Sequence, residues 1–218
     1  MQWAVKTLLV VASIVSITSQ VSATAVVIYE NDFEGAVGTE WSSTATDVTP
    51  VGARRFLGQF ASDRDNEVFL TLSDIPEHPY LQIEFDLFII RSWDGDSTTF
   101  GADLWELSVV DGPTLESRRY SQEHRFADVT EEDTLGYLWN GLPTVADSVY
   151  HRSYTFPHSE DSVVFRFFAE TDRGVTNESW GLDNVRVSLV PEPSSGSLVI
   201  IASCMASFAF FCRNRRRH

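Results

Sequence analysis

Three carboxylates far apart in the chain, Asp32, Glu34 and Asp183, form a candidate metal site. Asp183 shares the alternation of Val187 and Leu189 in the expected last strand, so it is predicted to face the core. A buried carboxylate needs a partner, because isolated burial of a charge is costly. If the first and last strands pair, Asp32 or Glu34 approaches Asp183, and calcium fits such a set of oxygens. The alternative is that Asp183 lies at a strand end and accepts backbone N–H groups.

A second acidic cluster contains Asp94, Asp96 and Asp103, with glycines between them. Alternating acids and glycines are typical of calcium loops, but the spacing of an EF-hand and its closing glutamate are absent. A solvated acidic turn is therefore the favoured interpretation. On this interpretation, Asp183→Asn removes most of any stabilisation by calcium, whereas Asp94→Asn is nearly silent.

Three tryptophans, Trp41, Trp93 and Trp139, lie in expected loops, whereas Trp105 lies in an expected strand. An exposed indole ring can stack on a sugar ring, because its face is flat and apolar while its N–H group is polar. The three loop tryptophans are therefore candidate ligand-binding residues for a polysaccharide. The alternative is that they fold over the edge of the domain and close its core.

Patterns that indicate catalysis are sparse. Glu84 and Asp86 match the first half of an E-x-D-x-x-E strand motif and in this resemble laminarinase-type glycosidases, but Ile89 stands where the second glutamate belongs. Retaining hydrolysis needs two carboxyl groups about 5–5.5 Å apart. No G-x-S-x-G motif and no metal-binding histidine spacing is present. The sequence thus predicts a protein that is not an enzyme, with a carbohydrate-active enzyme as the least favoured alternative.

Charge and cysteine content narrow the classes of partner. The chain has 31 acidic and 16 basic residues and a formal net charge of −15. Such a surface repels nucleic acid and anionic lipid, and it suits solubility outside the cell or the binding of divalent cations. Both cysteines, Cys204 and Cys212, lie in the C-terminal tail, so the domain is expected to fold without a disulfide.

Apolar alternation with a period of two predicts an all-β domain over residues 26–190. The clearest strand covers residues 80–90, where one face carries Leu81, Ile83, Phe85, Leu87 and Ile89. Other strands are expected at residues 26–29, 55–60, 67–72, 103–110, 118–126, 149–156, 162–169 and 180–189, and loops at 38–50 and 128–147. Short strands separated by turn residues favour an antiparallel, jelly-roll-type β-sandwich of two packed sheets.

Two short motifs support this fold. Residues 31–34 (Asn-Asp-Phe-Glu) and residues 180–187 (Trp-Gly-Leu-Asp-Asn-Val-Arg-Val) resemble the first and last strands of concanavalin-A-like jelly rolls, including MAM-type domains. The resemblance implies the fold and not the ligand. Because the cysteines of animal MAM domains are missing, it does not imply their role in adhesion.

The N-terminal residues 1–25 read as a secretory signal peptide. Lys6 supplies the positive charge, residues 8–17 are apolar, and Ala23-Thr24-Ala25 is an A-x-A cleavage site, with cleavage after Val21-Ser22-Ala23 as an alternative. The interpretation as an uncleaved anchor is less favoured, because the apolar run is short and is followed by small residues.

The C-terminal residues 191–218 contain Pro191, Glu192 and Pro193, an uncharged run at 198–212, and an arginine cluster. A helix over 198–212 is about 22 Å long, which is shorter than the hydrocarbon core of roughly 30 Å. Adding residues 194–197 and letting Arg213 snorkel makes a minimal transmembrane span, and the arginines favour a cytoplasmic end. A simple membrane anchor is one interpretation. The order of these parts resembles the PEP-CTERM sorting signal of bacterial surface proteins, which implies processing near the Pro-Glu-Pro motif by an exosortase, a membrane enzyme.

These observations predict an exported bacterial protein of the cell surface or extracellular matrix, held in the inner membrane by its C-terminal helix before processing. The favoured function is non-enzymatic binding of glycan or other matrix material. A structural or interaction module without affinity for glycans is the alternative.

Overall fold

The computed structural model describes residues 24–123, 125–139, 141 and 147–191 of the 218-residue chain. In these residues all regular structure is β, arranged in two antiparallel sheets, which confirms the predicted fold class. No helix in the described ranges is long and apolar enough to cross a membrane. The expected signal peptide up to residue 23, Glu192, Pro193 and the predicted helix at 198–212 lie outside the described residues.

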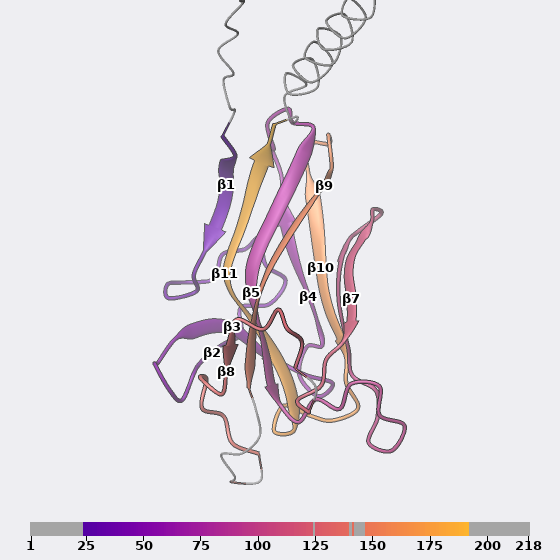
Figure 1. Ribbon diagram of the computed structural model, residues 1–218. Helices are drawn as coiled ribbons and strands as arrows, with labels where there is room; N and C mark the ends of the chain where they lie inside the picture. The colour runs from indigo at the N-terminus through magenta and orange to yellow at the C-terminus, as the bar shows by residue number, and fades with distance from the viewer. Residues whose placement is uncertain (1–23, 124, 140, 142–146, 192–218) are drawn as a thin grey trace, which may run out of the picture. The chain divides into compact units, whose positions relative to one another are not determined.

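The larger sheet contains seven strands (Figure 1). Six of them follow the order β2 (Thr46–Val48), β3 (Arg55–Phe60), β11 (Glu178–Val190), β5 (Tyr80–Arg91), β9 (Ser148–Pro157) and β8 (Glu131–Glu132). The seventh, β1 (Val26–Asn31), pairs with the C-terminal part of β11, where Asn31 lies opposite Val185. The first and last strands are therefore neighbours, as the predicted metal site requires.

The smaller sheet has the order β4 (Glu67–Leu72), β10 (Val163–Glu170), β6 (Leu104–Val109) and β7 (Thr114–Arg119). Strand β7 corrects the expected strand at residues 118–126. It starts earlier because residues 110–113 form a tight turn in which Asp111 has a φ of 58° and Gly112 donates its N–H to the Val109 carbonyl. The loop expected at residues 38–50 likewise contains the short strand β2.

The main core lies between the two sheets. Phe85 on β5 packs edge-to-face on Phe167 of β10 with ring centroids 5.6 Å apart, and Trp105 on β6 meets Trp180 of β11 at 6.1 Å. All four side chains are fully buried. Aromatic pairs of this kind contribute through buried apolar area and ring geometry, which suits a domain without a disulfide.

An ionic cluster joins the sheets inside one edge of the sandwich. Arg152 on β9 has a side chain only 6% exposed and approaches Glu116 of β7 at 3.4 Å. Its guanidinium also donates to the Tyr120 hydroxyl at 3.2 Å and to Asp128, and it lies over the Tyr150 ring at 4.8 Å. Since Arg152 sits opposite Phe85 in the sheet, it points into the space between the layers. The alternation of residues 149–156 is as predicted, but one inward position carries a charge.

The other face of the larger sheet is partly covered by a loop. A second apolar cluster gathers there and consists of Phe56, Phe88, Ile90, Leu135, Tyr137 and Val149. Leu135 and Tyr137 belong to the segment between β8 and β9, which the sequence predicts as a long irregular loop. This loop therefore packs on the sheet through Leu135 and Tyr137.

Both ends of the domain leave from the same end of the sandwich (Figure 1). Val26 pairs with Leu189, and Tyr80 at the start of β5 pairs with Val190. The β3–β4, β5–β6, β8–β9 and β10–β11 loops gather at the opposite end, which we call the loop end.

Candidate functional site

Asp183 does not face the core, which corrects the sequence prediction. The pairing of β11 with β5 is regular up to Asp183 opposite Asp86 and resumes at Arg186 opposite Glu84. The extra residue is a β-bulge at Asn184, whose φ is 51°. Because the bulge reverses the alternation, Leu182 and Val185 both face the core, while Asp183 lies on the outer face beside Asp86.

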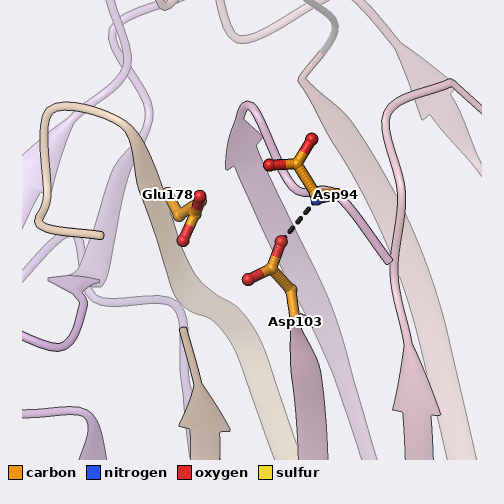
Figure 2. A group of neighbouring side chains, drawn as sticks. All are labelled: Asp94, Asp103 and Glu178. Atoms are coloured by element: carbon orange, nitrogen blue, oxygen red, sulfur yellow. Dashed lines mark hydrogen bonds between the residues drawn. The ribbon is translucent and has the colours of Figure 1, made fainter. Parts of the chain in front are cut away.

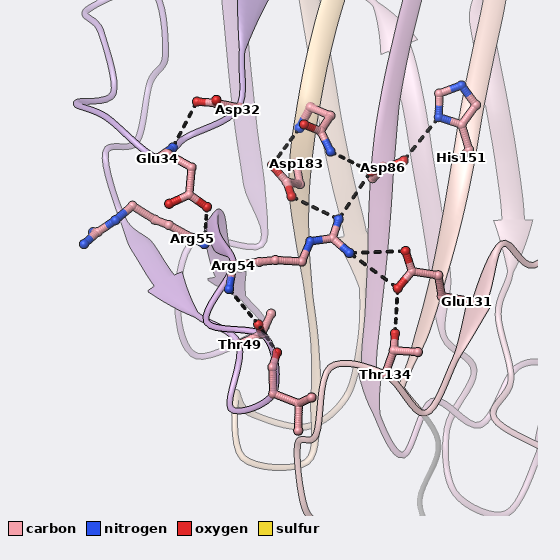
Figure 3. Close-up of polar contacts among 12 residues, drawn as sticks. Asp32, Glu34, Thr49, Arg54, Arg55, Asp86, Glu131, Thr134, His151 and Asp183 are labelled. Atoms are coloured by element: carbon pink, nitrogen blue, oxygen red, sulfur yellow. Dashed lines mark hydrogen bonds and ion pairs between the residues drawn. The ribbon is translucent and has the colours of Figure 1, made fainter.

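Arg54 is the partner of Asp183 on this face (Figure 3). Its guanidinium lies 3.1 Å from Asp183, 3.4 Å from Asp86 and 3.3 Å from Glu131. The side chain of Asp183 is only 6% exposed, and burial raises its pKa to about 6, although Arg54 and the Asn184 N–H oppose the shift. Ionised Asp183 is thus stabilised by the Arg54 guanidinium and by the Asn184 N–H, which donates to it at 2.8 Å. The alternative that Asp183 accepts backbone N–H groups is therefore correct in part.

Asp32 and Glu34 are engaged elsewhere (Figure 3). Asp32 accepts the N–H of Glu34 at 3.1 Å, and Glu34 accepts the N–H of Arg55 at 2.9 Å. Both are exposed. Within the described ranges, the structure does not bring their oxygens together with those of Asp183 as a group of possible metal ligands.

Two of the three candidate tryptophans close the core. Trp93 is fully buried and donates its indole N–H to the Ser179 carbonyl at 2.9 Å. Trp41 is 4% exposed, packs on Phe33 and Phe167, and donates to the Tyr29 hydroxyl. The core-lid interpretation therefore holds for both, and neither ring is available to a sugar.

Trp139 differs from the other two. It is only half-buried, in the β8–β9 loop, and its indole N–H donates to Asn177 Oδ1 at 2.9 Å. Its neighbour Leu138 is 51% exposed, and the Leu138 carbonyl accepts a hydrogen bond from Arg91. The ring is thus held in place while part of it remains accessible.

The β10–β11 loop, residues 171–177, connects the other loops of the loop end. Its Val175 N–H donates to Asp63 of the β3–β4 loop at 2.8 Å, and its Val175 carbonyl accepts from Arg91 at 2.6 Å. Its Asn177 carbonyl accepts the N–H of Ser92 at 2.9 Å. Together with the bond from Trp139 to Asn177, these bonds fix the four loops relative to one another, which is what a binding surface made of loops requires.

Three carboxylates meet at the loop end, and one of them was not predicted. Asp94 and Asp103 come from the β5–β6 segment, and Glu178 opens β11 (Figure 2). Each offers an oxygen, and these oxygens lie within 4.8 Å of one another. Asp103 is fully buried, so the interpretation of a solvated turn does not hold for it, and Glu178 is only 1% exposed. We call Asp94, Asp103 and Glu178 the carboxylate triad.

The electrostatics of the carboxylate triad are unfavourable for three ionised groups. Burial raises the pKa of Glu178, and the charges of Asp103 and Asp172 raise it further. Burial also raises the pKa of Asp103 and, to a smaller extent, of Asp94. The arrangement can hold a cation, or it can hold a proton shared between Glu178 and Asp103.

Comparison with known proteins adds little beyond the fold. No known protein family and no curated protein matches the sequence. The carbohydrate-binding module CBM6cm-2 from Cellvibrio mixtus lichenase 5A, solved with cellotriose, is 15% identical over 75% of this chain and 98% of the module, with a TM-score of 0.35. The mannan-recognising carbohydrate-binding module TmCBM27 is 13% identical over 77% of this chain and 99% of that chain, with a TM-score of 0.40.

An adhesin domain is similar to the same extent. The K3 domain of Lys-gingipain from Porphyromonas gingivalis w83 is 15% identical over 74% of this chain and 99% of the domain, with a TM-score of 0.35. Since all of these TM-scores are below 0.5, the proposals below rest on the residues of this chain.

Proposed function

We propose that this chain is an exported, non-catalytic surface protein whose β-sandwich binds extracellular polysaccharide at its loop end. The observation that carries the proposal is the half-buried ring of Trp139. Its N–H bond to Asn177 fixes the ring on the cross-linked loops, so little conformational entropy is lost when a sugar stacks on it. Trp41 and Trp93 no longer contribute to the proposal, because both rings lie in the core.

A non-catalytic role is supported by the surroundings of the incomplete glycosidase motif. Phe88 and Ile89 are buried, and neither can supply the missing carboxylate. Asp86 is already in contact with Arg54 and, at 3.2 Å, with His151. Release of reducing sugar from a polysaccharide by the purified protein would contradict this part of the proposal.

Export is supported by where the fold begins and ends. Strand β1 starts at Val26, next to the expected cleavage site, and β11 ends at Val190, next to Pro191. Removal of residues 1–25 and of the residues after Pro193 therefore leaves intact every strand in the part of the chain that the structure describes. We propose that an exosortase-type enzyme releases the domain to the cell surface or extracellular matrix.

For glycan binding, we expect Trp139→Ala to weaken the affinity of the protein for its polysaccharide by about 1–3 kcal/mol, a magnitude taken from stacking of nucleic-acid bases on aromatic side chains. The ring supplies the stacking surface, and its removal leaves the core unchanged. Glycan-array binding followed by titration with the best ligand measures the effect, and circular dichroism verifies the fold.

Tyr80→Ala is the matched control, because Tyr80 is a half-buried aromatic residue at the opposite end of the sandwich. Equal loss in the two variants, or unchanged affinity of Trp139→Ala, would exclude stacking on Trp139. If the unaltered protein binds no glycan at all, the domain is the structural or interaction module that the sequence left as an alternative.

For processing, we expect the secreted protein to end close to Pro193. The Pro-Glu-Pro motif directly follows the folded domain, so a protease can reach it without unfolding a strand. The intact mass of the secreted form measures the end point. Peptides from residues 208–213 found in that form would contradict the proposal, and deletion of the arginine cluster provides an unprocessed control.

A further inference from the structure

The carboxylate triad lies in a part of the loop end that has no positive side chain bound to it. Arg173, five residues before Glu178, is in an ion pair with Asp172 at 3.3 Å. In the part of the chain that the structure describes, none of the ion pairs includes Asp94, Asp103 or Glu178. The only lysine, Lys6, lies in the expected signal peptide.

One oxygen of the triad is buried without any partner. Asp103 is 0% exposed, and its Oδ1 has no hydrogen-bond partner in the structure. Its other oxygen accepts the N–H of Asp94, while the free oxygen lies on the side of Glu178 (Figure 2). A buried carboxylate oxygen that has lost its hydrogen bonds to water and gained no other donor destabilises the folded protein. A ligand that binds this oxygen removes that cost.

The backbone holds the three side chains in place from the other side. Glu178 accepts the N–H of Arg173 at 3.1 Å, so one of its oxygens is fixed and the other is free to bind. Asp94 lies in a β-bridge with Ser121, which fixes the start of the β5–β6 segment. The remaining oxygens converge from two positions of the β5–β6 segment and from the first residue of β11.

We propose that the carboxylate triad of Asp94, Asp103 and Glu178 binds a divalent cation of the calcium class. Two oxygens on opposite sides of a calcium ion are about 4.6–5.2 Å apart, given bond lengths of about 2.3–2.6 Å, so oxygens within 4.8 Å of one another can share one ion. The donors are all carboxylate oxygens, which suit a hard cation such as calcium better than they suit zinc. The ion binds the β5–β6 segment to the start of β11 and so stabilises the loop end.

This site differs from the one that the sequence predicts. Asp183 is already paired with Arg54, so Asp183→Asn is no longer expected to remove the stabilisation by calcium. Glu178→Gln, in the carboxylate triad, is expected to remove it instead. The inference holds whether or not the loop end binds a glycan.

The test compares thermal unfolding of the full-length chain in calcium and in chelator. At a calcium concentration about 100 times the Kd, the melting temperature is expected to rise by about 5–10 °C. Glu178→Gln and Asp103→Asn lose this rise. In chelator, Glu178→Gln melts at the same temperature as the unaltered protein or higher, because it removes a repulsive charge. A variant that is merely misfolded melts lower in both conditions.

Terbium luminescence gives a second measurement that does not depend on stability. Trp93 and Trp180 lie next to the triad in sequence and can sensitise a bound terbium ion, which calcium then displaces. The affinity for terbium and for calcium in this titration is expected to be at least tenfold weaker in Glu178→Gln. Asp183→Asn and Asp96→Asn are the acidic controls and keep both the luminescence and the response to calcium.

Three results would overturn the proposal. Identical melting temperatures in calcium and in chelator, with no terbium signal, would show that the triad binds no cation and that Glu178 and Asp103 share a proton. Loss of the response in Asp183→Asn but not in Glu178→Gln would return the site to Asp183. Cation binding that is weakened as much in Asp96→Asn as in Glu178→Gln would show that cations bind to the acidic surface as a whole.

Discussion

Replacement of Arg152 by leucine is expected to lower the free energy of unfolding by about 3–5 kcal/mol, the cost of breaking a buried ion pair by removing one partner. Glu116, whose side chain is 8% exposed, keeps its charge but loses the guanidinium 3.4 Å away. Tyr120 and Asp128 lose donors at the same time. The contact between Arg152 on β9 and Glu116 on β7, which links the two sheets, is therefore lost.

Denaturant unfolding measures this loss, and the double variant Glu116→Leu/Arg152→Leu separates pairing from packing. If the unpaired charge causes the cost, the double variant recovers part of the stability, because no buried charge remains. Arg119→Leu on β7 is the control, since Arg119 is exposed. A loss in Arg152→Leu no larger than that of the control would show that Arg118, 3.6 Å from Glu116, and the hydroxyls of Tyr120 and Tyr154 hold the Glu116 charge without Arg152.

Replacement of Arg54 by leucine is expected to cost about 2–3 kcal/mol near pH 8, less than for Arg152, because the Arg54 side chain is 30% exposed and solvent screens part of the interaction. The loss leaves Asp183 beside Asp86 with no cation between them. The pKa of Asp183, already raised to about 6 by burial, therefore rises further in the variant.

The sign of the pH dependence follows from this shift. Since the pKa of Asp183 is higher in the folded state than in the unfolded chain, protonation favours folding below about pH 4, and this contribution is lost as the pH rises through 6. The deficit of Arg54→Leu should accordingly shrink as the pH falls from 8 to 5. Asp86 and Glu131 also lose their ion pairs with Arg54 in the variant, so they add to the deficit at pH 8.

Unfolding curves of the two proteins at several pH values test this expectation. Arg186→Leu is the control, because its contact with Glu30 at 3.5 Å is on the surface and is expected to be worth less than about 1 kcal/mol. A deficit that is independent of pH would mean that packing of Arg54 on Phe88, at 4.9 Å, outweighs its charge.

Strand positions were predictable where alternating apolar residues are bounded by turn residues. The strands expected at residues 55–60 and 67–72 coincide with β3 and β4. Strand β7 was misplaced because it lies at a sheet edge and most of its residues are exposed or half-buried, so it lacks an apolar alternation. What locates it is the turn at Asp111, which is a matter of backbone geometry.

The face of Asp183 could not be predicted from alternation. The rule assumes a regular strand, and the bulge at Asn184 inserts one residue that inverts it. Asparagine tolerates positive φ better than most residues, so a Leu-Asp-Asn-Val sequence permits a bulge there but does not require one. The partner of Asp183 is equally hidden, since Arg54 comes from a distant part of the chain.

The carboxylate triad shows the same limit. Asp94 and Asp103 were recognised as an acidic cluster, but Glu178 reaches them only when β11 joins the sheet, so the third carboxylate was not predicted. The burial of Trp93 was also not predictable from its neighbours in the sequence. Trp93 follows β5 in a segment that looks like an open loop, yet its N–H finds the Ser179 carbonyl and the ring turns inward.

Strand β11 pairs with β1, β3 and β5, so the larger sheet is joined through the last strand of the domain. None of these pairings can form before residues 178–190 are available, and such distant pairings form slowly. In a chain that is threaded N-terminus first through a narrow channel, β1, β3 and β5 therefore lack their β11 partner until residues 178–190 emerge. Until β11 arrives, one edge of β5 is unpaired and can associate with other chains, so rapid delivery of the final segment protects the protein from aggregation.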